Sequence, residues 1–201
     1  NQIVDIGFKI RDAINIYYET NSQEDPTSNF QWEFVLVDDD QTKNAWCMPG
    51  GKIAFYSGIL PILKNEDGVA SVMGHEIAHA VARHSAERAS TAMVTDLGIM
   101  ALEQFVLGQR LPQAAGYVRQ FGLDLPFNRK QESEADYLGL IFSSLAGYDI
   151  NESYKVWERM KEDMGGSGPS EFFSTHPSPD NRIKNLKEWI PIVSKQYPAI
   201  G

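Results

Sequence analysis

The sequence predicts a mostly helical α+β domain with a small antiparallel β-sheet. Apolar residues recur at helical spacing in several segments, whereas residues 32–37 and 44–58 hold short runs typical of strands. The second stretch is divided by Pro49-Gly50-Gly51, a turn sequence that joins two extended pieces. The 201 residues suit one domain, so we expect a single folded unit over residues 1–201.

The composition excludes several classes of function. A net charge of −9 without a basic run argues against binding of nucleic acid. The one cysteine excludes an internal disulfide and a Cys-rich zinc finger. No uncharged stretch approaches the roughly 18 residues of a membrane span, so we expect no transmembrane segment in this chain. The sequence begins at Asn1 without a methionine, so processing or trimming could have removed a signal peptide or anchor. The sequence does not predict an oligomeric state.

The first part of the chain is expected to contain a helix, a loop and the sheet. Isoleucines at helical spacing predict a helix over residues 3–18, and a polar stretch around Pro26 predicts a loop. The strand over Gly51–Ser57 has two interpretations. It could bind an extended peptide substrate along a sheet edge, or it could be a core strand without a role in binding.

The motif His75-Glu76-Ile77-Ala78-His79 is the clearest functional signal. On a helix, His75 and His79 lie about 40° apart around the axis, so both rings can reach one ion. Glu76 can then contact a water on that ion without binding the ion itself. This HExxH pattern combines two zinc ligands with a general base. The helix has an apolar stripe for a core on the neighbouring face, and Asn65 is expected to cap its start.

His84 is a weak candidate for a third ligand. If the helix runs on past it, His84 lies about 140° around the axis from His79. We therefore expect it to be a surface histidine. A histidine six residues after His79, which would indicate a metzincin, is absent because Ser85 occupies that position.

Residues 91–127 lie between the motif helix and the next predicted helix. They could form a lid or wall over the cleft, or an ordinary helical hairpin.

The third ligand is expected from a helix over residues 128–146. Glu132 and Asp136 are four residues apart and share one side of this helix. Glu132 would bind the metal, and Asp136 would accept the other ring N–H of a ligating histidine. Glu134 points away and is expected to be solvated. The alternative is that these acidic residues simply favour a helix N-terminus.

Four motifs in this order resemble the HtpX-like zinc metallopeptidases: NAWCMPGGKI, HEIAHAVARH, ESEAD and STHPSPDNR. That family includes the CAAX prenyl endopeptidases and the soluble periplasmic proteases BepA and LoiP. This chain looks more like the BepA and LoiP branch, because Asp96 and Glu103 follow the motif helix and exclude a membrane span there. The resemblance implies a gluzincin, the zincin class with two His and one Glu ligands. It also implies one Zn²⁺ per chain, with Glu132 as the third ligand.

The C-terminal part is expected to carry a further site histidine. A helix over residues 151–164 leads into 165–176, predicted as a flexible active-site loop, and a last helix begins at Ser178. His176 could donate a hydrogen bond to the oxyanion of the reaction, with assistance from Arg182. In BepA-like members of the resembling family, this histidine can instead occupy the open metal position. Both roles stay open, as does a histidine that only ends a loop.

The motifs and the resemblance together predict a zinc-dependent metalloendopeptidase that hydrolyses internal bonds of unfolded or misfolded polypeptides. Zn²⁺ would be held by His75, His79 and Glu132, with Glu76 as the general base. Envelope protein quality control, in the periplasm or at the outer membrane, is expected from the resemblance. One alternative is a metal-stabilised chaperone or assembly factor whose protease activity is kept latent by His176. Another is a zinc hydrolase of non-peptide amides.

Overall fold

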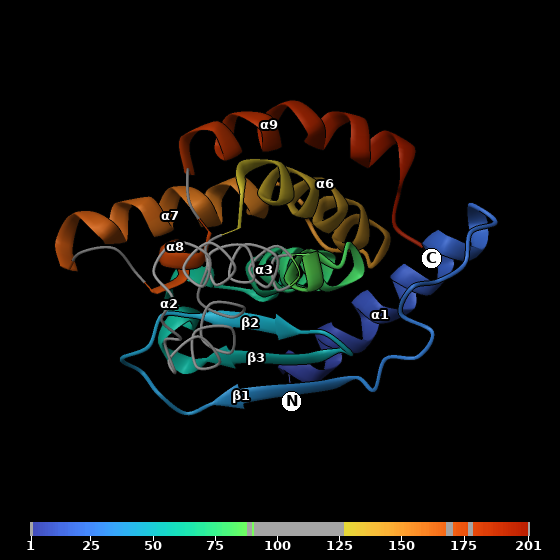
Figure 1. Ribbon diagram of the computed structural model, residues 1–201. Helices are drawn as coiled ribbons and strands as arrows, with labels where there is room; N and C mark the ends of the chain where they lie inside the picture. The colour runs from blue at the N-terminus through green and yellow to red at the C-terminus, as the bar shows by residue number, and fades with distance from the viewer. Residues whose placement is uncertain (1, 88–89, 91–126, 168–170, 177–178, 201) are drawn as a thin grey trace, which may run out of the picture.

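The computed structural model describes residues 2–87, 90, 127–167, 171–176 and 179–200. Within these residues, helices predominate around one small sheet, as predicted (Figure 1). The elements in chain order are α1 (Gln2–Thr20), β1 (Glu33–Val37), β2 (Ala45–Met48), β3 (Lys52–Tyr56), the 3-10 turn η1 (Ser57–Ile59), α2 (Leu60–Leu63), α3 (Glu66–Val81), α6 (Arg129–Leu145), α7 (Glu152–Ser167), α8 (Glu171–Thr175) and α9 (Pro179–Gln196). The predicted lid or wall over residues 91–127 lies outside the described residues except for Phe127.

The elements form layers with α3 at the centre. Figure 1 shows α9 above α6 and α7, these two helices above α3, and the sheet below α3. Helix α1 contacts α3, α6 and β1, and so closes the core on a further side. Helix α3 therefore has neighbours on nearly all sides, and every residue from Gly68 to Val81 except Ser71 is buried. A helix in this position can present polar side chains only to an enclosed interior site.

The sheet is mixed, so the prediction of an antiparallel sheet is wrong for one of its two pairings. The strand order is β1-β3-β2, with β1 parallel to β3 and β2 antiparallel to β3. The β2–β3 pair is the predicted hairpin, and residues 38–44 carry the chain from β1 past the position of β3. The central strand β3 is hydrogen-bonded on both sides and cannot accept an added peptide strand. Of the two interpretations of the Gly51–Ser57 strand, the core strand is the correct one.

The helices begin where the sequence predicts, since their caps are local. The Asn65 side chain accepts a hydrogen bond from the backbone N–H of Gly68, 2.8 Å away, at the start of α3. Asn128 and Gln131 form a reciprocal capping box at the start of α6. Helix α3 nevertheless ends at Val81 instead of running on, because the backbone turns at Arg83, which has φ of 58°. Residues 84–87 are helical again in a new direction.

The stretch 165–176, predicted as a flexible loop, is helical at both ends in the structure. Helix α7 continues through Ser167, and residues 171–175 form α8; residues 168–170 lie outside the described part. Helix α8 is held by its aromatic residues. Phe172 and Phe173 are buried, with ring centroids 5.5 Å and 5.9 Å from that of Trp157 on α7. This packing outweighs the loop tendency of the neighbouring glycines, which is the only signal that the local sequence offers.

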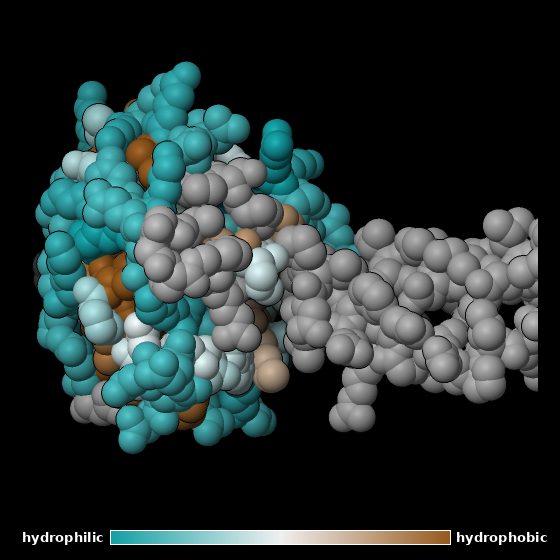
Figure 2. All heavy atoms as spheres, turned by 90° about the vertical axis from the view of Figure 1, so that its left-hand side faces the viewer, coloured by the Kyte–Doolittle hydropathy of each residue, from teal (hydrophilic) through white to brown (hydrophobic). Residues whose placement is uncertain are grey.

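On the face shown in Figure 2, hydrophilic residues cover most of the described surface. Among the described residues, no helix combines the length and apolar character needed to cross a membrane.

Two glycines set the distance between α3 and α6. A Cβ placed on Gly139 of α6 would lie 2.9 Å from the backbone nitrogen of His75 and 3.1 Å from the carbonyl carbon of Gly74. A Cβ on Gly74 would lie 2.7 Å from the Ser143 Oγ. The two backbones therefore approach as closely as they can at the turn that carries His75. The Ser143 hydroxyl donates to the carbonyl of Ala70 across the same contact, at 3.1 Å.

We predict that Gly139→Ala lowers both stability and affinity for Zn²⁺. Alanine favours a helix over glycine by about 1 kcal/mol. Forcing a methyl group against backbone that cannot rotate away costs about 1–3 kcal/mol, so the net effect is destabilising. The free energy of unfolding in urea and a competition titration with Zn²⁺ measure the two losses. Lys130→Ala, at an exposed position of the same helix, is the control and should change stability by less than about 0.5 kcal/mol. Unchanged values for Gly139→Ala would contradict this account of the contact.

Candidate metal centre

The four histidines of the chain all converge on one buried site. His75 and His79 lie on α3, His84 follows the end of that helix, and His176 follows α8. Each is at most 3 % exposed to solvent. Since polar side chains are seldom buried without partners, the cluster indicates a functional centre.

Four side chains direct nitrogen or oxygen atoms at one point. The Nε2 atoms of His75 and His79 are 3.0 Å apart, and Glu132 Oε1 lies 3.3 Å from His79 Nε2. His176 Nδ1 completes the group, 2.9 Å from Glu132 Oε1 and 3.3 Å from His75 Nε2. All four ligand atoms lie within 4.8 Å of one another. The structure thus brings together the three predicted ligands, and His176 with them.

This group fits a tetrahedral metal ion. Bonds of about 2.1 Å from zinc to nitrogen and oxygen place neighbouring ligand atoms about 3.4 Å apart. Four of the distances between these atoms, from 2.9 Å to 3.3 Å, are close to that spacing. Burial lowers the pKa of His79 well below its usual range, which keeps its ring neutral with a free lone pair. Two imidazoles and a carboxylate are a donor set that suits zinc.

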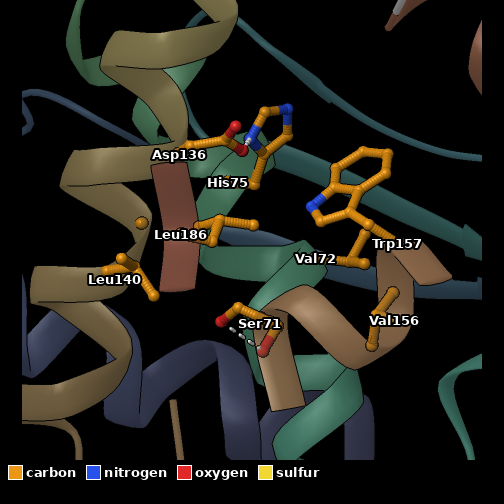
Figure 3. Close-up of a pocket in the computed structure, with 10 residues that line it drawn as sticks. Ser71, Val72, His75, Asp136, Leu140, Val156, Trp157 and Leu186 are labelled. Carbon is orange, nitrogen blue, oxygen red and sulfur yellow. Dashed lines mark hydrogen bonds and ion pairs between the residues drawn. The ribbon is translucent and has the colours of Figure 1, made fainter. Parts of the chain in front are cut away.

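Asp136 contacts the outer nitrogen of His75. Figure 3 shows the Asp136 carboxylate beside the His75 ring. Its Oδ1 lies 3.0 Å from His75 Nδ1, so Nδ1 carries the ring proton and Nε2 is left as the candidate ligand atom. Asp136 and Glu132 lie one turn apart on α6. The predicted arrangement of one ligand and one supporting carboxylate on the same helix face is present in the structure.

Arg182 pairs with both carboxylates instead of pointing at the reaction side. Its Nε and Nη2 donate to Asp136 at 2.7 Å and 2.6 Å, and its Nη1 lies 2.5 Å from Glu132 Oε2. Burial alone would raise the pKa of Glu132, but Arg182 and His176 outweigh it and hold that pKa well below its usual range. Burial likewise opposes the effect of Arg182 on Asp136, whose pKa is lowered. The guanidinium stacks on the Trp157 ring, 3.6 Å from its centroid.

Glu76 is buried beside the ligand group without belonging to it. Its Oε1 lies 3.2 Å from His176 Nε2, on the side of that ring away from Glu132. Burial raises the pKa of Glu76, although His176 and His75 act in the opposite direction. A carboxyl of this kind can both accept and return a proton.

His176 is fixed in place by its neighbours. Its ring stacks on Phe172 with centroids 4.4 Å apart, and its backbone N–H donates to the carbonyl of the same residue at 3.0 Å. Phe127 stacks against it on another side, at 5.2 Å. Its two ring nitrogens therefore contact the ligand group and Glu76 at once.

The prediction of a surface position for His84 is wrong. The backbone turn at Arg83 brings the His84 ring back beneath α3, where its Nδ1 lies 2.9 Å from His79 Nδ1. Glu134 is 52 % exposed, but its carboxylate lies 3.2 Å from His84 Nε2 and is not simply solvated. Burial lowers the pKa of His84, against the influence of Glu134. Helical periodicity could not reveal this contact because it assumes that α3 continues.

Comparisons with known proteins show a matching family and several similar proteins. The model of peptidase family M48 matches residues 16–190. The mitochondrial metalloendopeptidase OMA1 of Schizosaccharomyces pombe is 45 % identical over 166 residues, covering 82 % of this chain and 48 % of that protein. OMA1 of Saccharomyces cerevisiae is 36 % identical over 211 residues, covering 98 % and 57 %. A beta-barrel assembly-enhancing protease of Yersinia pestis is 30 % identical over 168 residues, covering 78 % and 34 %.

These relatives confirm the predicted resemblance at the level of the metallopeptidase family. The chain spans about half the length of the OMA1 relatives from the two yeasts. The motifs led to the bacterial branch alone, whereas the OMA1 proteins share higher identity with this chain. Because the OMA1 relatives are named as mitochondrial, the expected location in the periplasm or at the outer membrane is not confirmed.

We predict that Arg182→Met strongly destabilises the metal-free protein. Removing the cation leaves two buried carboxylates without their partner, which costs about 3–5 kcal/mol of unfolding free energy. Urea unfolding in the presence of a chelator at pH 7 measures this loss. The matched control is Arg11→Met on α1, where the exposed pair with Asp12 contributes about 0–1 kcal/mol. Equal losses in the two variants would contradict the assignment.

The same pairing predicts a pH dependence for the wild-type protein. Arg182 lowers the pKa of Glu132 and Asp136 in the folded state, so their pairing contributes its full stability above the unfolded values of about 4. That contribution is lost as the pH falls below about 4 and through the lower folded values. The deficit of Arg182→Met relative to wild type should therefore shrink with acidification. A deficit that stays constant between pH 7 and pH 3 would argue against the pairing.

Proposed function

Because the chain belongs to peptidase family M48, we propose that it is a zinc metalloendopeptidase that cuts internal bonds of polypeptide chains. One observation carries the proposal: the HExxH histidines and Glu132 converge on one point, and the buried Glu76 lies beside it. A purely structural metal site needs no unligated carboxylate at that position. Glu76 therefore favours an enzyme over a chaperone or assembly factor, since holding a protein requires no general base.

We propose zinc as the metal and His75, His79 and Glu132 as its permanent ligands. When bound, zinc polarises the substrate carbonyl and lowers the pKa of a water molecule toward neutrality. Arg182 keeps Glu132 ionised and therefore ready to bind a cation. Asp136 holds the ring of His75 with its Nε2 toward the ion.

Glu76 is the proposed general base. It takes a proton from the attacking water and later returns it to the amine of the leaving peptide. Its raised pKa suits this exchange, because the acid form becomes accessible closer to neutral pH than for an exposed carboxyl. Its burial also excludes bulk water as a competing proton source.

We further propose that the protein has a latent form in which His176 closes the site. Its Nδ1 belongs to the ligand group and its Nε2 contacts Glu76, so the ring fills the space between the metal position and the base. A water molecule and a substrate carbonyl need that same space. His176 must leave before hydrolysis, and its placement here supports a plug over an oxyanion donor.

The strand β2 is the proposed docking edge for substrate, in place of the central strand β3. Among the described strands, β1 and β2 are the two edges of the sheet, because each pairs on one side only. Strand β2 is the edge that packs against α3, which carries the HExxH motif. An extended peptide added to this edge would gain backbone hydrogen bonds that do not depend on its sequence. Such binding favours unfolded or misfolded chains, which expose backbone donors and acceptors. The relatives' names are consistent with protein quality control as the wider role.

We predict that Glu76→Gln keeps the metal and loses proteolysis. The amide preserves size but cannot accept the proton of water, so the cleavage rate should fall about 10²- to 10⁴-fold. Casein digestion with and without a chelator measures the activity, and metal analysis measures the bound zinc. Glu66→Gln, at the exposed start of the same helix, is the matched control and should retain activity. Full activity in Glu76→Gln would rule out this base.

We predict that His176→Ala raises proteolytic activity. If the open form makes up one-tenth of the wild-type population, removing the plug increases the rate about tenfold. The same casein assay measures the change, normalised to bound zinc because a fourth ligand is lost. A fall in activity at equal zinc content would instead assign His176 to the oxyanion and refute the latent form.

A further inference from the structure

Both histidines of the HExxH motif have their Nδ1 atoms held, each by a different kind of group. Asp136 holds His75, as the sequence predicted, at 3.0 Å. His84 holds His79, at 2.9 Å between the two Nδ1 atoms. The carboxylate partner of a metal-binding histidine is common. A second imidazole in that position is unusual.

With a cation at the metal position, one arrangement of ring protons satisfies every contact along this path. His79 Nε2 faces Glu132 Oε1 and His75 Nε2, so it carries the lone pair for the metal. His79 Nδ1 then carries the proton and donates it to His84 Nδ1. His84 in turn is protonated on Nε2, which lies 3.2 Å from Glu134 Oε2. Each donor meets an acceptor, from the exposed carboxylate of Glu134 through to the ligand group.

The backbone is arranged to make this contact. Arg83 takes the left-handed conformation, with φ of 58°, which residues other than glycine seldom adopt. That turn ends α3 and returns His84 beneath His79. The ring of His79 is also stacked on Phe127 with centroids 3.7 Å apart. Phe127 limits the plane of the ring, and His84 distinguishes its two nitrogens.

We propose that His84 is a positioning residue for the metal centre, which acts through His79 and is itself oriented by Glu134. It holds His79 in the tautomer whose Nε2 lone pair points at the metal position. This inference rests on the metal site proposed above. It assigns to His84 no contact with the metal or the substrate.

The test compares two substitutions of similar size. His84→Leu cannot accept the proton of His79, and its Zn²⁺ affinity should fall about 10- to 100-fold in a competition titration. His84→Gln can accept from His79 through its carbonyl and donate to Glu134 through its amide, so it should recover most of that loss. Glu134→Ala, at an exposed position, should lose less affinity than His84→Leu. Urea unfolding of the metal-free variants reports any loss of packing separately.

A second readout follows the proton itself. With four histidines in the chain, long-range ¹H–¹⁵N spectra can assign each ring tautomer. Zinc-loaded wild type should show His79 protonated on Nδ1 and His84 protonated on Nε2, and a His84 ring protonated on Nδ1 would contradict the proposal.

Three results would overturn the proposal. Wild-type Zn²⁺ affinity in His84→Leu would remove the role of His84 while leaving the metal site intact. Equal losses of affinity and stability in the Leu and Gln variants would show that His84 contributes only through packing. Failure of the wild-type protein itself to bind Zn²⁺ would remove the metal site, and this inference with it.

Discussion

The close backbone contact between α3 and α6 is the constraint on which the metal centre depends. His75 and His79 lie on one helix and Glu132 on the other, so their separation is set by how near the two axes approach. Gly74 and Gly139 allow that approach because neither carries a side chain at the crossing. The remaining helices and the sheet surround this pair and keep it rigid. A site that needs atoms about 3.4 Å apart has little tolerance for a wider crossing.

Part of the negative charge of the site is also offset before any metal binds. Glu132 and Asp136 place two negative charges in the interior, and Arg182 on α9 supplies the compensating cation. Its guanidinium contacts both carboxylates on α6 and stacks on the Trp157 ring of α7. One side chain of α9 therefore links three helices. This is a stabilising network only while every member is present, because each charge would be costly to bury alone.

His176 and His84 show that the centre extends beyond the two helices that build it. One follows a short helix held by aromatic packing, and the other follows a turn at Arg83. His176 contacts the ligand group, and His84 contacts His79 from a different side. Both contacts depend on segments whose course is not set by helical periodicity. We interpret the first as a control on access to the metal and the second as support for a ligand.

The sequence by itself determined the helix that carries His75, Glu76 and His79 and the start of α6, because these depend on spacing along one helix and on local caps. It indicated the family from motifs spread along the chain, and this resemblance together with their four-residue separation singled out Glu132 and Asp136. Only the tertiary structure decided the parallel pairing of β1 and β3, the helical form of residues 171–175, and the place of His84 beneath His79. Each of these follows from contacts between residues far apart in the chain or from a backbone turn that breaks periodicity. Residue spacing within one segment carries no information about either.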